Sequence, residues 1–62
     1  MIYRYEIINA NLYLYMNMKN EFSKELSVIA NDYITNHNIN YSGNKIYLII
    51  DGIVVKVIKK DF

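Results

Sequence analysis

The fold is decided by residues 45–58, which read KIYLIIDGIVVKVI. Asp51 and Gly52 stand between two runs of β-branched and other apolar residues. A type I′ turn needs a positive φ at both central positions, and Asp-Gly is one of the pairs that tolerate this best. The stretch therefore predicts a β-hairpin with a two-residue loop.

The two-residue loop also predicts the register of this hairpin, because it fixes which residues lie opposite each other. The pairs on one face are all apolar: Ile50 with Ile53, Leu48 with Val55 and Ile46 with Val57. The pairs on the other face are Ile49 with Val54 and Tyr47 with Lys56. We expect the wholly apolar face to form the core.

Upstream of the hairpin, the pattern of residues 20–38 changes to helical periodicity. Its apolar positions are Phe22, Leu26, Ile29, Tyr33 and Ile34. Asn20 is a suitable N-cap, and Glu21 suits the first turn of a helix. Asn38, which tolerates a left-handed backbone, follows His37 at the other end. We therefore predict an amphipathic helix over about 20–37.

The first 17 residues alternate between apolar and polar positions, with a turn at Asn9, Ala10 and Asn11. A loop of two or four residues would form a hairpin over about 2–17. One face would then carry Tyr3, Tyr5, Ile7, Leu12, Leu14 and Met16, and the other Arg4, Glu6, Tyr13 and Tyr15. One long, bent strand is the alternative interpretation.

Together these elements predict a single α+β domain over 1–62. Its order is β-β-α-β-β, with the second hairpin over about 45–59 and one helix on one face of an antiparallel or mixed four-stranded sheet. In element order and length the chain resembles a β-grasp domain, such as the small bacterial immunoglobulin-binding domains. That resemblance implies terminal strands lying parallel at the sheet centre, although a sequential or differently ordered sheet is also open. It is architectural and transfers no binding residues.

Composition limits the function further. The chain has 62 residues, a formal net charge of +1, one histidine and no cysteine. The charge gives no broad attraction for nucleic acid or anionic membranes, and no apolar run approaches the roughly 20 residues of a membrane helix. Without a recognisable leader, we expect a cytoplasmic protein. Ile, Asn, Tyr and Lys exceed half of the residues, a bias that suits an A/T-rich genome.

No constellation of residues predicts catalysis or a cofactor. Glu21 and Glu25 lie one turn apart, beside Lys24, where a solvated helix face is the simpler interpretation. Asp32 and His37 do not share a helix face well, and His37 suits a solvated helix end. Two glycines cannot form a glycine-rich phosphate loop, and no serine lies in a G-x-S-x-G turn. We expect no enzyme activity, metal or small-molecule substrate.

The second sheet face, which one helix cannot cover, is the candidate site. Its predicted partner-binding residues are Arg4, Tyr13, Tyr15, Tyr47, Ile49, Val54 and Lys56. An exposed patch rich in tyrosine with few charges is typical of interaction surfaces. The plain alternative is that strands carry such residues for β-propensity alone.

We therefore expect a small, non-enzymatic protein-interaction module that binds another protein or itself as a homodimer. It could act as a phage or mobile-element inhibitor of a host protein, a class that includes anti-CRISPR proteins, or as a self-associating accessory protein. The alternative function is binding of single-stranded nucleic acid, with the tyrosines as a stacking platform beside Arg4, Lys45 and Lys56.

Overall fold

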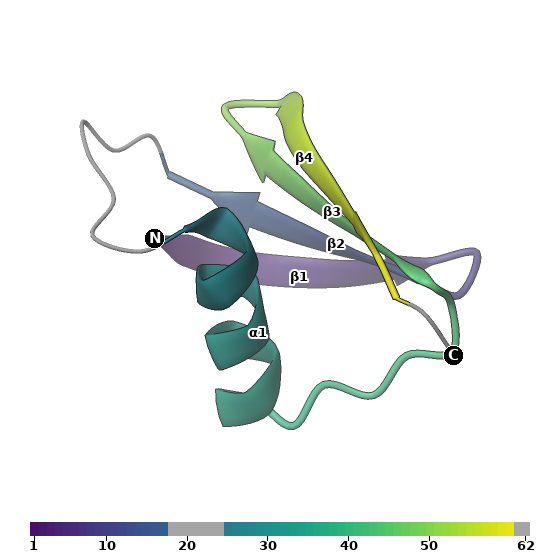
Figure 1. The fold of residues 1–62 in the computed structure, drawn as a ribbon. Coiled ribbons are helices and arrows are strands. Elements are labelled where there is room, and N and C mark those ends of the chain that lie inside the picture. The colour runs from purple at the N-terminus through teal and green to yellow at the C-terminus, as the bar shows by residue number, and fades with distance from the viewer. Residues whose placement is uncertain (18–24, 61–62) are drawn as a thin grey trace.

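Four strands and one helix build the domain, for which a computed structural model describes residues 1–17 and 25–60. In chain order they are β1 (Ile2–Ile8), β2 (Asn11–Met16), α1 (Leu26–Asn36), β3 (Lys45–Ile50) and β4 (Ile53–Lys59). The strands form one mixed sheet, with the helix against one of its faces (Figure 1). The predicted α+β fold and the β-β-α-β-β order are confirmed.

The strand order in the sheet is β1-β2-β3-β4. The two strands that precede and follow the helix in sequence, β2 and β3, therefore lie at the centre of the sheet. β2 pairs with β3 in parallel, and each central strand pairs antiparallel with its hairpin partner. This differs from the β-grasp arrangement, in which the terminal strands occupy the centre. Here β1 and β4 are the two edges.

The first hairpin has a two-residue loop, so the prediction of two strands is confirmed over one bent strand. Ile8 pairs with Asn11, and the loop residues Asn9 and Ala10 both have positive φ, 50° and 69°. A bulge between Ile2 and Arg4 places Ile2, rather than Tyr3, opposite Met16. The predicted position of Tyr3 is therefore wrong, whereas Tyr5 and Ile7 pair with Leu14 and Leu12 as expected.

The second hairpin has the predicted turn but a shifted register beyond it. Asp51 and Gly52 have φ of 52° and 80°, and Ile50 and Ile49 pair with Ile53 and Val54 as predicted. A bulge at Val55 then makes Lys56 the partner of Leu48. The predicted pairs beyond the bulge are wrong: Tyr47 pairs with Val57, and Ile46 with Ile58. An extra residue in one strand exchanges the faces of everything after it.

Helix α1 begins at Leu26, because Glu25 before it is extended, with φ −64° and ψ 153°. The described helix is therefore shorter than predicted, and the expected N-cap Asn20, with Glu21 and Phe22, lies outside the described residues. The predicted end is confirmed. His37 is the C-cap, Asn38 has a φ of 51°, and the Ile39 amide donates to the Ile34 carbonyl.

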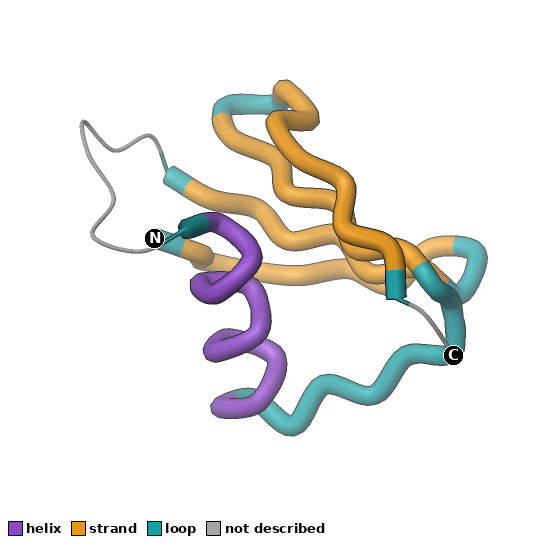
Figure 2. Tube along the Cα trace, viewed as in Figure 1, coloured by secondary structure: helices purple, strands orange, loops and turns teal. Residues whose placement is uncertain are grey.

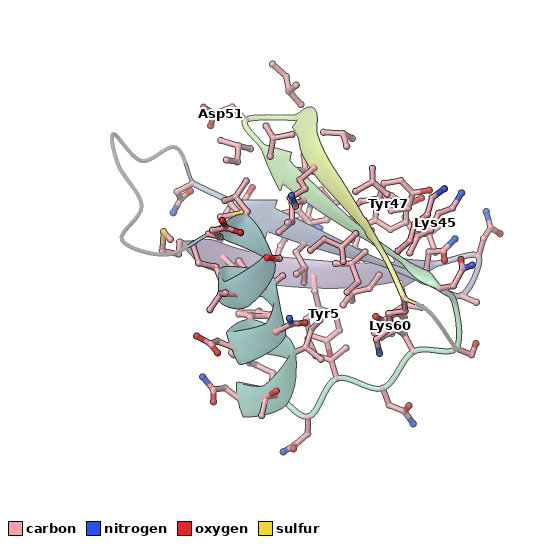
Figure 3. The ribbon with its side chains drawn as sticks, in the orientation of Figure 1. Tyr5, Lys45, Tyr47, Asp51 and Lys60 are labelled. Carbon is pink, nitrogen blue, oxygen red and sulfur yellow. The ribbon has the colours of Figure 1, made fainter. Side chains whose placement is uncertain are left out.

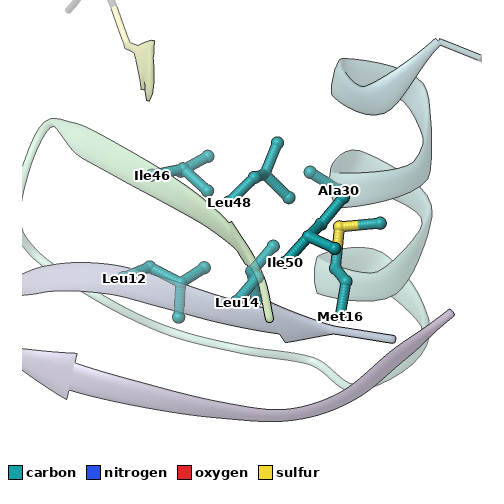
Figure 4. Close-up of a cluster of buried hydrophobic side chains, with 7 residues drawn as sticks. All are labelled: Leu12, Leu14, Met16, Ala30, Ile46, Leu48 and Ile50. Carbon is teal, nitrogen blue, oxygen red and sulfur yellow. The ribbon is translucent and has the colours of Figure 1, made fainter. Parts of the chain in front are cut away.

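The core lies between the helix and the two central strands (Figure 4). Seven buried side chains form it: Leu12, Leu14, Met16, Ala30, Ile46, Leu48 and Ile50. Leu26, Ile29, Tyr33 and Ile34 of the helix pack against this cluster, together with residues of the following loop. The prediction that Ile46, Leu48 and Ile50 are core residues is confirmed. The prediction is wrong for their expected partners on β4: Ile53, Val55 and Val57 are exposed.

The loop after α1 runs back to the end of the sheet where the first hairpin turns (Figure 2). The Gly43 amide donates to the Ala10 carbonyl at 2.5 Å. A Cβ on Gly43 would collide with that carbonyl and with the Asn11 side chain. Glycine at this position therefore lets the loop approach the turn. The helix of the described chain is neither long nor apolar enough to cross a membrane.

Replacing Ala10 by glycine should stabilise the protein. Ala10 has a φ of 69°, where a Cβ costs roughly 1–2 kcal/mol. Glycine removes that strain but adds freedom to the unfolded chain, so the free energy of unfolding should rise by about 0.5 kcal/mol. Urea unfolding measures the change.

The matched control is the opposite change in the other hairpin turn. Gly52 has a φ of 80° and open space around its Cα, so Gly52→Ala should lower the free energy of unfolding by about 1 kcal/mol. An Ala10→Gly variant less stable than the parent protein would contradict the assigned turn.

Candidate functional site

The sheet face away from the helix is made of three rows that cross all four strands. We call it the tyrosine face. Strand pairing places Arg4, Tyr15, Ile49 and Val54 in the first row, and Glu6, Tyr13, Tyr47 and Val57 in the second. The third row contains Ile8, Asn11, Lys45 and Lys59. Six of the seven predicted binding residues therefore lie together on this face.

Tyr13 and Tyr47 stack on each other at the centre of the face. Their ring centroids are 4.4 Å apart and their planes differ by 9°. Neighbouring strands lie about 4.8 Å apart, so rings stacked across β2 and β3 must stand upright on the sheet. One flat side of each ring is covered by the other tyrosine, and the ring edges point outward.

Arg4, Glu6 and Tyr15 form a polar cluster beside this stack. An Arg4 nitrogen lies 2.8 Å from a Glu6 carboxylate oxygen, and the guanidinium carbon lies 3.7 Å from the centre of the Tyr15 ring. The Tyr15 hydroxyl donates to Glu6, which lowers the pKa of that carboxyl below its ordinary 4.5, with a second contribution from Arg4. The same hydrogen bond raises the Tyr15 pKa.

These contacts make the tyrosine face less exposed than the sequence predicts. Ile49 lies on it with only 8% of its surface exposed, although the described helix lies against the other face. Tyr13, Tyr15 and Tyr47 are half-buried. Burial, followed by the proximity of Tyr47, raises the pKa of Tyr13. The side chains of this face therefore pack against one another and hold a defined surface.

Lys56 is the one predicted binding residue that does not lie on the tyrosine face. The bulge at Val55 pairs it with Leu48, whose side chain belongs to the core face. Regular alternation from Val54 would place Lys56 and Ile58 on the tyrosine face. The bulge places Val57 and Lys59 there instead. No sequence signal marks Val55 as the extra residue, because it is an ordinary β-branched residue in a regular run.

Two lysines lie opposite each other at one end of the tyrosine face. Lys45 of β3 pairs with Lys59 of β4, next to Tyr47, which Figure 3 labels beside Lys45. Like charges directly across a strand pair repel. The Lys45 amide donates to the Asn11 side chain at 3.1 Å, which joins this end to β2. This end of the surface would favour a negatively charged group.

The other candidates from the sequence do not converge on a site. His37 stacks on Tyr33 with centroids 4.0 Å apart, and its Nδ1 lies 3.0 Å from the Tyr33 carbonyl oxygen. Glu21 lies outside the described residues. Across residues 1–17 and 25–60 no pocket opens, and no group of three side chains suited to a metal ion occurs.

Comparison with known proteins adds no relative: no protein-family description, curated protein or solved structure matches the chain.

Acid should weaken the fold through Glu6. Its pKa is lower in the folded protein than in the unfolded chain, so the stabilisation is present above pH 4.5 and is lost as pH falls through the folded pKa. Urea midpoints across acidic pH should therefore fall less for Glu6→Gln than for the parent protein.

Tyr15→Phe tests the cause of that shift. It removes the hydroxyl that donates to Glu6 but keeps the ring beneath Arg4. The pKa of the Glu6 carboxyl, followed by NMR, should move up toward 4.5. An unchanged Glu6 titration in this variant would show that the hydrogen bond is not the cause.

Proposed function

We propose that the chain is a non-enzymatic module that binds another protein through the tyrosine face. The observation that carries this proposal is the ordered patch formed by Tyr13, Tyr15 and Tyr47 on the sheet face opposite the described helix. Tyrosine supplies large, rigid contact area with few rotatable bonds and a polar tip. Upright rings direct those hydroxyl tips toward a partner.

The charges on the tyrosine face favour a partner of a particular kind. Lys45 and Lys59 stand together at one end, while Arg4 and Glu6 on β1 neutralise each other. A complementary surface would place a carboxylate against the lysine pair and apolar or hydrogen-bonding groups against the tyrosines. We propose an acidic patch on a folded protein as the target.

Within this class we favour an inhibitor of a host protein, encoded by a phage or mobile element, with anti-CRISPR proteins as one example. The support is an amino-acid bias that suits an A/T-rich genome, together with the ordered tyrosine face. A cytoplasmic accessory protein remains the other candidate. Both functions use the same face, so one set of variants tests them together.

Single-stranded nucleic acid is the second candidate ligand, and the lysine pair is the observation that favours it. Stacking of bases needs aromatic rings whose flat sides are open. Tyr13 and Tyr47 each turn one flat side to the other, and Arg4 covers a flat side of Tyr15. The ring arrangement therefore favours protein over nucleic acid.

Capture from a host lysate tests the proposal. The immobilised chain should retain a specific protein, and Tyr47→Ser should reduce that retention at least about tenfold if Tyr47 is a hot spot. Val28→Ser is the matched control, because Val28 is an exposed apolar residue on the helix, and it should retain the protein fully.

Two results would contradict the proposal. One is capture that Tyr47→Ser and Tyr13→Ser leave unchanged while both variants remain folded by circular dichroism. The other is tight binding of mixed-sequence single-stranded DNA or RNA at physiological salt that Tyr47→Ser abolishes, which would assign the tyrosine face to nucleic acid.

A further inference from the structure

Strand β4 is an edge strand of the described sheet and carries four exposed apolar residues. Ile53, Val54, Val55 and Val57 are 67%, 50%, 45% and 43% exposed. β4 pairs with β3 on one side, and as the last strand of the sheet it presents backbone N–H and C=O groups on the other. Exposed apolar edges of this kind are templates for pairing with another strand.

We propose that β4 pairs antiparallel with β4 of a second copy, which joins two four-stranded sheets into one continuous sheet. This inference goes beyond the proposed function, because it assigns a second surface. The two-fold axis would pass between Val55 and Lys56, perpendicular to the sheet. Such an axis keeps the tyrosine faces of both copies on the same side.

The bulge at Val55 fixes the register in which a second copy would pair with β4. Before the bulge, Ile53 faces the helix side and Val54 the tyrosine face; after it, Val57 faces the tyrosine side and Ile58 the helix side. Two copies of a bulged strand match face for face along their length where the two bulges meet, because each extra residue exchanges the faces of the residues after it. A second β4 brings the same bulge to the same place, so two residues oppose two.

This register matches side chains on both faces. Val54 lies opposite Val57 of the second copy, and Ile53 lies opposite Ile58, so each apolar pair stays on its own face. Asp51, the one acid in residues 45–60, comes level with Lys60. Figure 3 shows these two residues at opposite ends of the hairpin, as an antiparallel pairing requires.

Lys56 opposes the pairing. The two Lys56 residues would lie diagonally across the axis, where like charges repel. A single strand pair also buries less surface than a standard interface. We therefore expect a weak dimer, populated at about 100 μM, whose affinity comes largely from main-chain hydrogen bonds.

Sedimentation of the full chain over a concentration series tests this inference. The parent protein should show a monomer–dimer equilibrium, and Ile53→Lys should weaken it about tenfold or more, because the substitution enters the interface twice. Ile7→Lys is the matched control: Ile7 is an exposed apolar residue on the helix side of the other edge strand, and the dimer should persist. Lys56→Thr should tighten it.

Disulfide trapping tests the register directly, because the chain has no cysteine of its own. A mixture of Val54→Cys and Val57→Cys chains should form mixed disulfides faster than either variant forms disulfides with itself. The proposal is overturned if the parent protein stays monomeric into the millimolar range, or if the two variants cross-link no faster together than alone.

The proposed β4 pairing would also be overturned if Ile7→Lys disrupted the dimer, because the interface would then lie on β1. It would be overturned equally if Tyr47→Ser disrupted the dimer and Ile53→Lys did not, because the interface would then lie on the tyrosine face. Lysate capture in the monomeric Ile53→Lys variant keeps the two proposals separate. Loss of the dimer with retained capture leaves binding by the tyrosine face intact.

Discussion

The parallel pairing of β2 with β3 is the constraint on which the rest of the structure depends. It sets Leu14 beside Leu48 on the core face and, on the other face, Tyr13 beside Tyr47. Each strand belongs to a different hairpin, and the helix between them closes the crossover that a parallel pair needs. One register thus produces both the buried core and the stacked tyrosines, so a change that shifts it would alter both faces together.

Local features of this chain could be predicted from the sequence because turn chemistry acts over a few residues. Asp51 and Gly52 specified their turn, and Asn38 marked the helix end. The two bulges could not be predicted, since Tyr3 and Val55 fit a regular strand by residue type. Strand order was likewise hidden, because periodicity shows which face a residue occupies and not which strand lies beside it.

The sequence predicted most of the residues of the candidate site but not how their side chains pack. Alternation placed Tyr13, Tyr15 and Tyr47 on one face, whereas their mutual packing follows from the order of strands. Because the rings stack across β2 and β3 and Arg4 covers Tyr15, each of the three rings has one flat side covered by another side chain of the face. A further exposed apolar surface lies at β4, where the edge position of the strand exposes it.

Strand order is therefore the claim that decides the account, and inter-strand nuclear Overhauser effects measure it directly. The account predicts cross-peaks between Tyr13 and Tyr47 ring protons and between the backbones of Leu14 and Leu48. Cross-peaks joining β1 to β4, with none between β2 and β3, would place the terminal strands at the sheet centre and contradict it.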